Sequence, residues 1–194
     1  MSNQVKIGIS ARHIHLSQEH ADILFGEGYE FTPKPGVEPK GQWAVQERVE
    51  LIAPKSSFPK VGIMCPTRKQ TQVEISKTDA FALGLKPPIR MSGDLAGSEG
   101  NVIIRGPKGE VELKEGVIIA KRHLHAGKAF AAENGIADGQ VVKLKVTTDE
   151  RSLIFDDVVA RVGGEGTEGT VHIDTDEGNA ADLPMWSVGE IIVD

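Results

Sequence analysis

The amino-acid sequence contains the motif Arg-His-x-His twice, with the two copies 110 residues apart. In both copies the histidines end a run of residues that is typical of a β-strand. Side chains two residues apart in a strand point to the same face. His13 and His15 therefore project together, and so do His123 and His125. Two imidazoles on one face form a metal-ligand arrangement. A single pair can also decorate an exposed strand, but a second copy with the same preceding arginine weighs against that interpretation.

Short strands and tight turns are predicted along most of the chain. The 22 glycines and 10 prolines favour such a fold over a helical bundle. Alternating apolar residues predict strands, and Ser17 and Ser76 are expected to cap short helices. Strands are expected at residues 5–9, 43–52, 61–65, 71–75, 102–104, 111–113, 116–120, 141–146, 153–162, 171–173 and 188–193, and short helices at residues 21–25, 80–83, 128–133 and 179–182.

The order of these elements repeats, because each Arg-His-x-His segment leads into a strand followed by a capped helix. A repeat of this length is too long for a solenoid. We therefore predict a mainly β fold with short α-helices, in which internal duplication gives two small β-barrel domains with helical caps.

The composition argues against several classes of protein, namely nucleic-acid-binding, membrane-spanning and disulfide-bonded proteins. The net charge of −6 argues against nucleic acid or an anionic membrane as a partner. The amino-terminal residues include no apolar segment of a signal peptide, and no stretch approaches the length of a membrane span. The one cysteine, Cys65, excludes an internal disulfide and fits a reducing compartment. It lies in an apolar strand, so we expect a buried, inert thiol and a cytoplasmic protein.

Each histidine pair needs a further ligand, because catalytic zinc usually takes three protein ligands and leaves one position open. His172 is the remaining histidine in a strand-like segment, whereas His20 is expected to face solvent from a helix. Glu74 is the carboxylate candidate. It shares a strand face with Gln72, and the alternative is that Glu74 is simply the polar side of an amphipathic strand.

Two cations are candidates for anion recognition. Arg68 lies in a polar bend expected at residues 66–70, and arginine suits bidentate recognition of phosphate or carboxylate. Lys55 lies in a turn and could contact a phosphorylated ligand. Either residue could instead be a solvated surface charge. No glycine-rich phosphate loop and no G-x-S-x-G motif occurs. The residues alone thus predict a metalloenzyme or a metal-binding protein without choosing a reaction.

Five segments, in order along essentially the whole chain, resemble the PduL-type phosphate acyltransferases, also called phosphate propanoyltransferases. The resemblance implies interconversion of acyl-CoA and phosphate with acyl phosphate and coenzyme A, with two zinc ions per chain. The segments are residues 10–17, 68–76, 92–98, 120–125 and 171–180.

The resemblance also implies roles for individual residues. Arg68 matches the family's phosphate-binding arginine. The ligands of one zinc would be His13, His15 and Glu74, those of the other His123, His125 and His172, and the coenzyme A contacts Ile9, Ser10, Ala11, Lys55 and Asn179. At one further coenzyme A position, where a basic residue is common in the family, this chain has Gly62, with Lys60 close by.

For the fold, the resemblance implies two β-barrels in which the first strand joins the carboxy-terminal half. Residues 1–11 with 121–194 would form one barrel, and residues 12–120 the other, with a small insertion near residues 26–46. It suggests a homodimer. Members that enter bacterial microcompartments often carry an amino-terminal extension, and this chain starts almost directly on its first strand, so encapsulation by that route is not expected.

The expected mechanism is direct attack of phosphate on the thioester of a short-chain acyl-CoA, propanoyl or acetyl, without an acyl-enzyme. The site with Glu74 would meet the coenzyme A sulfur, and the all-histidine site would support water, phosphate or the carbonyl oxygen. The alternatives are a zinc-dependent thioester or acyl-phosphate hydrolase and a zinc-stabilised binding module. Three candidate ligands per site and no spare cysteine favour catalysis.

Overall fold

The computed structural model describes residues 3–38 and 41–193. The chain forms two compact units. Unit 1 comprises Met1–Ala11 and Lys121–Asp194, and unit 2 comprises Arg12–Ala120. Each unit has its own hydrophobic core. The candidate ligands His13, His15 and Glu74 lie in unit 2, and His123, His125 and His172 lie in unit 1.

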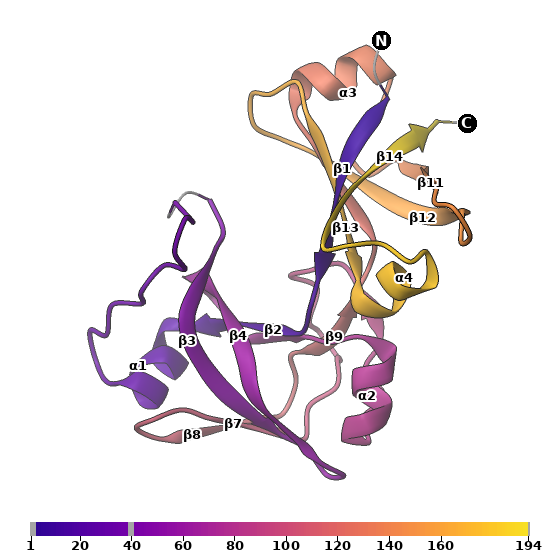
Figure 1. Cartoon of the computed structure of the whole chain (residues 1–194). Coiled ribbons are helices and arrows are strands. Elements are labelled where there is room, and N and C mark those ends of the chain that lie inside the picture. Colours follow the sequence, from indigo (N-terminus) through magenta and orange to yellow (C-terminus); the bar gives the residue numbers. More distant parts are fainter. Residues whose placement is uncertain (1–2, 39–40, 194) are drawn as a thin grey trace. The chain divides into compact units, whose positions relative to one another are not determined.

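Unit 1 is a closed β-barrel with the strand order β1-β13-β10-β12-β11-β14 (Figure 1). Closure leaves no unpaired strand edge. Its strands are β1 (Gln4–Ser10), β10 (His123–Ala126), β11 (Val141–Val146), β12 (Leu153–Val162), β13 (Gly169–Asp174) and β14 (Trp186–Ile192). Its helices are α3 (Lys128–Asn134) and α4 (Thr175–Ala180). Alternate strand residues such as Ile7, Leu124 and Val171 fill the barrel and are fully buried.

Unit 2 is a curled sheet with the strand order β6-β9-β5-β2-β4-β3-β7-β8. Its strands are β2 (His13–Ser17), β3 (Trp43–Ile52), β4 (Ser57–Arg68), β5 (Gln72–Glu74), β6 (Ile89–Arg90), β7 (Val102–Arg105), β8 (Glu110–Leu113) and β9 (Val117–Ala120). Its helices are α1 (Gln18–Phe25) and α2 (Lys77–Leu83). The core gathers Ile14, Leu24, Leu51 and Ile63, from β2, α1, β3 and β4.

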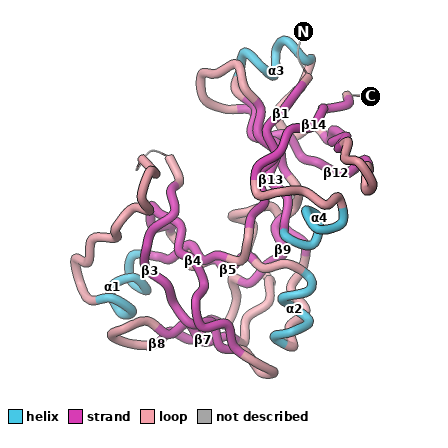
Figure 2. The backbone as a smooth tube through the Cα atoms, in the orientation of Figure 1, coloured by secondary structure: helices cyan, strands magenta, loops and turns pink. Residues whose placement is uncertain are grey.

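The predicted class, mainly β with short helices, is confirmed, and strands dominate the traced backbone in both units (Figure 2). Of the two predicted barrels, the first is closed and the second is a curled half-barrel. Its edge strands β6 and β8 are short and do not pair with each other, which leaves the sheet open. The segment before β3, where an insertion was expected, includes residues 39–40, which lie outside the described residues, and β3 already begins at Trp43.

Two elements differ from the sequence-based boundaries in ways that matter for the site. Strand β4 continues through the cis Cys65–Pro66 peptide to Arg68, where the sequence suggested a bend. Helix α4 covers Thr175–Ala180 and not residues 179–182, because Asp174 forms a capping box with Glu177 and starts the helix earlier.

The same local topology occurs in both units, which supports the predicted duplication. Strand β2 lies between β4, to which it is parallel, and β5, to which it is antiparallel. Strand β10 lies in the same way between parallel β12 and antiparallel β13. Strands β5 and β13 each run into a short helix with a capping box, α2 and α4. The described residues include no helix of the length and apolarity that crossing a membrane requires.

Candidate functional site

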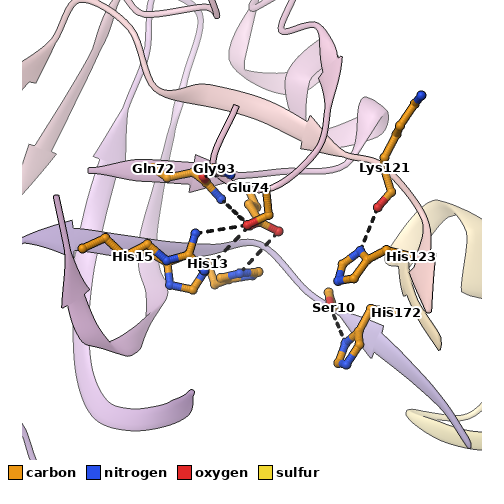
Figure 3. Close-up of polar contacts among 11 residues, drawn as sticks. Ser10, His13, His15, Gln72, Glu74, Gly93, Lys121, His123 and His172 are labelled. Atoms are coloured by element: carbon orange, nitrogen blue, oxygen red, sulfur yellow. Dashed lines mark hydrogen bonds and ion pairs between the residues drawn. The ribbon is translucent and has the colours of Figure 1, made fainter. Parts of the chain in front are cut away.

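The first cluster joins His13, His15 and Glu74 in unit 2. Strands β2 and β5 pair so that His13 lies opposite Glu74, and the two-residue repeat of β2 brings His15 to the same face. The ligand atoms of the three side chains all lie within 4.8 Å of one another. Glu74 Oε2 is 3.5 Å from His13 Nε2, and Glu74 Oε1 is 3.7 Å from His15 Nε2 (Figure 3).

This spacing fits a metal ion. Nitrogen and oxygen ligands about 2.1 Å from a tetrahedral zinc lie about 3.4 Å from each other. Two imidazoles and one carboxylate also form a known catalytic zinc set that leaves one position open. In the described part of the chain, the buried Nδ1 of His15 has no hydrogen-bond partner. Burial, followed by the charges of His13 and Arg68, lowers the pKa of His15 to about 2, which keeps its ring neutral and able to coordinate.

Glu74 is held by polar neighbours that sequence reasoning did not assign to the site. Gln72 Nε2 donates a hydrogen bond to Glu74 Oε1, and Ser92 Oγ donates to the same oxygen at 2.9 Å. Gln72 is in turn fixed by the Gly93 amide, which donates to its Oε1 at 2.8 Å (Figure 3). Gln72 and Glu74 are both buried. The polar side of β5 is therefore shielded from solvent, and the role of Glu74 as a metal ligand stays a prediction.

Arg68 reaches this cluster from the end of β4. Its backbone pairs with Ser17 of β2, and its Nη1 donates a hydrogen bond to Ser92 Oγ at 3.0 Å. Arg68, Ser92 and Glu74 thus form a continuous chain of hydrogen bonds. Ser92 belongs to residues 92–98, one of the segments that carry the family resemblance. No sequence pattern indicated that Ser92, 18 positions after Glu74, would contact Glu74.

The second cluster joins His123, His125 and His172 in unit 1. His123 of β10 lies opposite His172 of β13. The ring centroids are 4.8 Å apart for His123 and His125, 5.4 Å for His123 and His172, and 5.3 Å for His125 and His172. Three imidazoles are the ligand set of another class of catalytic zinc site. The third candidate ligand is therefore Glu74 in unit 2 and His172 in unit 1.

Hydrogen bonds orient two of these rings. His123 Nδ1 lies 2.9 Å from the carbonyl oxygen of Lys121, which can only accept, so Nδ1 carries the proton and Nε2 carries the lone pair (Figure 3). His172 Nδ1 lies 3.4 Å from Ser10 Oγ. Burial, followed by the charges of His123 and Arg161, lowers the pKa of His125 to about 4. These features favour neutral imidazoles at His123 and His125. Among the described residues, however, only His13, His15 and Glu74 bring three such ligand atoms within 4.8 Å of one another.

The residues matched to coenzyme A contacts are distributed over both units. Ser10 is next to the second cluster through His172. Ile9 packs on helix α4, where a Cβ at Gly178 would lie 2.5 Å from Ile9 Cδ1. Asn179 is an exposed residue of that helix, and Ala11 is exposed after β1. Lys55 lies in the turn between β3 and β4, with its Nζ 4.5 Å from the ring centre of Phe81.

Three further residues can be compared with their predictions. His20 does not face solvent freely. It is partly buried, its Nδ1 lies 2.7 Å from Thr71 Oγ1, and burial lowers its pKa. Cys65 is buried as expected, and burial raises the pKa of its thiol. Gly62 lies opposite His13 in β4, and a Cβ there would meet no atom within 4 Å.

Comparisons with known proteins agree on one family. The family profile described as Phosphate propanoyltransferase matches residues 6–184. A phosphate propanoyltransferase of Thermotoga maritima is 48% identical over 186 residues, covering 96% of this chain and 86% of that protein. Proteins of the same name from Listeria monocytogenes and Lachnoclostridium phytofermentans are 44% and 46% identical, each over 97% of this chain and 87% of their own length.

The matched family profile and the relatives named phosphate propanoyltransferase thus define an acyltransferase. The chain belongs to the phosphate propanoyltransferase family.

Proposed function

We propose that this protein is a zinc-dependent phosphate acyltransferase that interconverts a short-chain acyl-CoA and phosphate with acyl phosphate and coenzyme A. Propanoyl-CoA or acetyl-CoA is the proposed substrate. The observation that carries the proposal is the connection of Arg68, through Ser92, to the cluster of His13, His15 and Glu74. The proposed phosphate-binding cation and the proposed metal ligands are thereby linked in one partly buried network.

Each cluster is proposed to hold one zinc ion, the first by His13, His15 and Glu74 and the second by His123, His125 and His172. When bound, zinc supplies Lewis-acid charge that stabilises a carbonyl oxygen and a leaving thiolate. The protein's own contribution is to keep the ligand side chains neutral or deprotonated and fixed in place. Burial of His15 and His125 and the hydrogen bonds on Glu74 and His123 support that role.

Arg68 is proposed to bind and orient phosphate. Its planar guanidinium can donate two parallel hydrogen bonds to two phosphate oxygens. The hydrogen bond from Nη1 to Ser92 fixes the orientation of the guanidinium. Holding phosphate beside the thioester carbonyl removes much of the entropic barrier of a two-substrate reaction. Removing one such charged contact typically lowers the rate about 10²–10³-fold.

The chemical step is proposed to be direct. A phosphate oxygen forms a bond to the thioester carbonyl carbon, the carbon–sulfur bond then breaks, and coenzyme A leaves as the thiolate with its electron pair. The product is acyl phosphate. No acyl-enzyme is needed, and Cys65 is a poor nucleophile because burial keeps its thiol protonated.

Coenzyme A is proposed to contact Ile9, Ser10, Ala11, Lys55 and Asn179. The position of Ser10 beside His172, a proposed metal ligand, supports this assignment. Lys55 is exposed, and its positive charge suits a phosphate group of coenzyme A. The homodimer, the cytoplasmic location and the lack of microcompartment targeting stay predictions.

Initial-rate kinetics test the proposal against a hydrolase. We expect release of coenzyme A from propanoyl-CoA to require phosphate, with intersecting lines in double-reciprocal plots that indicate a ternary complex. Undiminished release without phosphate would instead indicate a thioester hydrolase. Parallel lines, with acylated protein, would contradict direct transfer.

A further inference from the structure

The arginine of the first Arg-His-x-His motif points away from the metal cluster to helix α2. Arg12 Nη2 lies 2.5 Å from Asp79 Oδ1, and the Arg12 guanidinium stacks 4.2 Å from the ring centre of Phe58. The Asp79 side chain is only 6% exposed. Asp79 is also the third residue of helix α2, where it forms a capping box with Ser76. Arg12 therefore ties the strand of the histidine pair to the first turn of a helix.

The arginine of the second motif makes the same set of contacts in unit 1. Arg122 Nε lies 2.7 Å from Glu177 Oε1, and its guanidinium lies 5.5 Å from the ring centre of Phe155. Glu177 is the third residue of helix α4, where it forms a capping box with Asp174. The two aromatic partners come from β4 and β12, the strands parallel to β2 and β10.

The two arrangements agree in their spacing along the chain. In each unit the third ligand candidate, Glu74 or His172, lies two residues before the helix N-cap. The acid that binds the arginine follows that ligand by five residues in both units. The arginine itself directly precedes the first histidine of the pair. If these arginines were only surface charges, the same ion pair to a helix acid and the same aromatic contact would not be expected in both units.

We propose that Arg12 and Arg122 are positioning residues, each of which clamps the helix after its unit's third metal ligand against the strand of that unit's histidine pair. Arg12 holds Glu74 against His13 and His15, and Arg122 holds His172 against His123 and His125. The inference rests on the proposed metal sites and goes beyond them, because neither arginine is itself a ligand.

The physical basis is a buried carboxylate that needs a partner. Without Arg12, the buried Asp79 side chain loses its ion-pair partner, and because an unpaired buried charge is costly, the first turn of α2 then moves or takes up water. The backbone from Glu74 to the N-cap is only two residues long, so a shift of the turn displaces the ligand. Loss of support to metal ligands typically weakens metal affinity about 10–100-fold.

The duplication provides an internal control for the experiment. Two single-site backgrounds are made, His125→Ala to leave only the first cluster and His15→Ala to leave only the second. In each background Arg12→Met and Arg122→Met are introduced, and Co²⁺ affinity is measured by absorption in competition with a chelator. We expect Arg12→Met to weaken only the first site and Arg122→Met only the second, each by about 10–100-fold.

Two further variants separate positioning from general stability. Arg105→Met removes an exposed arginine with two ion pairs, to Glu50 and Glu110, and is expected to leave both affinities unchanged. Asp79→Asn removes the buried charge while keeping the side chain's shape, and is expected to restore part of the affinity lost in Arg12→Met. If Arg12→Met does not fold by circular dichroism, Arg12→Lys replaces it, with a smaller expected loss at the same site only.

Equal weakening of both sites by either variant, or no weakening, would overturn the inference. Failure of the chain to bind Co²⁺ at either cluster would overturn it together with the proposed zinc sites. Normal metal binding without acyl transfer would reject the proposed reaction and leave this inference standing, because the measurement uses no acyl-CoA.

Discussion

The Ser92 hydroxyl donates a hydrogen bond to Glu74 Oε1 across 2.9 Å. The same oxygen atom of Ser92 accepts a hydrogen bond from Arg68 Nη1 at 3.0 Å. One side chain thus links the proposed phosphate-binding residue to a proposed metal ligand, and neither partner is its neighbour in sequence. Changing Ser92 should therefore affect phosphate and metal together.

Ser92→Ala is expected to lower kcat about 10-fold or more and to raise the KM for phosphate, because Glu74 and Arg68 both lose a positioned partner. Steady-state kinetics and zinc analysis of the same sample measure both effects. Ser56→Ala is the matched control, since the Ser56 hydroxyl donates to the Ala82 carbonyl and not to Glu74. Wild-type kinetics in Ser92→Ala would show that this link has no role in the reaction.

Arg68→Ala is expected to lower the rate about 10²–10³-fold while zinc content stays near that of the unchanged protein. Arg68→Lys should recover little, because a lysine cannot form the bidentate contact. The comparison variant is Arg90→Ala, which removes an exposed ion pair with Asp94. If Arg68→Ala kept normal turnover with saturable phosphate, phosphate would have to bind elsewhere.

Gly62→Arg is expected to lower the KM for acyl-CoA. The position lies opposite His13, has open space for a side chain, and corresponds to a common basic position in the family that the sequence resembles. One exposed contact to a phosphate of coenzyme A is worth about 0.2–1 kcal/mol, or roughly a 1.4- to fivefold change. Gly62→Glu should have the opposite effect. Similar KM values for both variants would mean that coenzyme A does not pass this residue.

The stability of the metal-free protein is expected to fall in acid because of His15. Its pKa is about 2 in the folded protein, against 6.5 for the free side chain. Below about pH 6.5 the unfolded chain therefore binds a proton that the folded chain does not. The free energy of unfolding consequently decreases as the pH is lowered. For one proton the slope reaches about 1.4 kcal/mol per pH unit.

Urea unfolding of the metal-stripped protein at several pH values between 7.5 and 5 measures this slope. His15→Gln should show a shallower slope, since glutamine does not titrate. Parallel curves for the two proteins would show that His15 is protonated in the folded chain.

The sequence predicted the parts of the site that depend on short spacing. The pairs His13–His15 and His123–His125 follow from the two-residue repeat of a strand, and Ser76 was recognisable as a helix cap. The residues alone named Glu74 and His172 as candidates for the third ligands, but only the resemblance assigned them, because Glu74 also fitted the polar side of an amphipathic strand. Only the pairing of β2 with β5 brings Glu74 opposite His13.

Contacts between distant segments were not predictable in this way. Asp79 is 67 residues from Arg12, and Ser92 is 24 residues from Arg68, so no local pattern signals either contact. The extent of closure of a sheet is likewise a property of all its strands. The duplication predicted two small β-barrels without saying how far each closes, and β6 and β8, the edge strands of the second sheet, do not pair with each other.

In the proposed reaction, the acyl group passes from coenzyme A to phosphate with the help of metal bound by this chain. Phosphorus-31 nuclear magnetic resonance of a mixture with propanoyl-CoA and phosphate tests it directly. The zinc-loaded protein should produce a propanoyl phosphate signal, and the signal should disappear after chelation and return on addition of zinc. Release of propanoate and coenzyme A without any acyl phosphate, or an unchanged rate after complete metal removal, would contradict the claim.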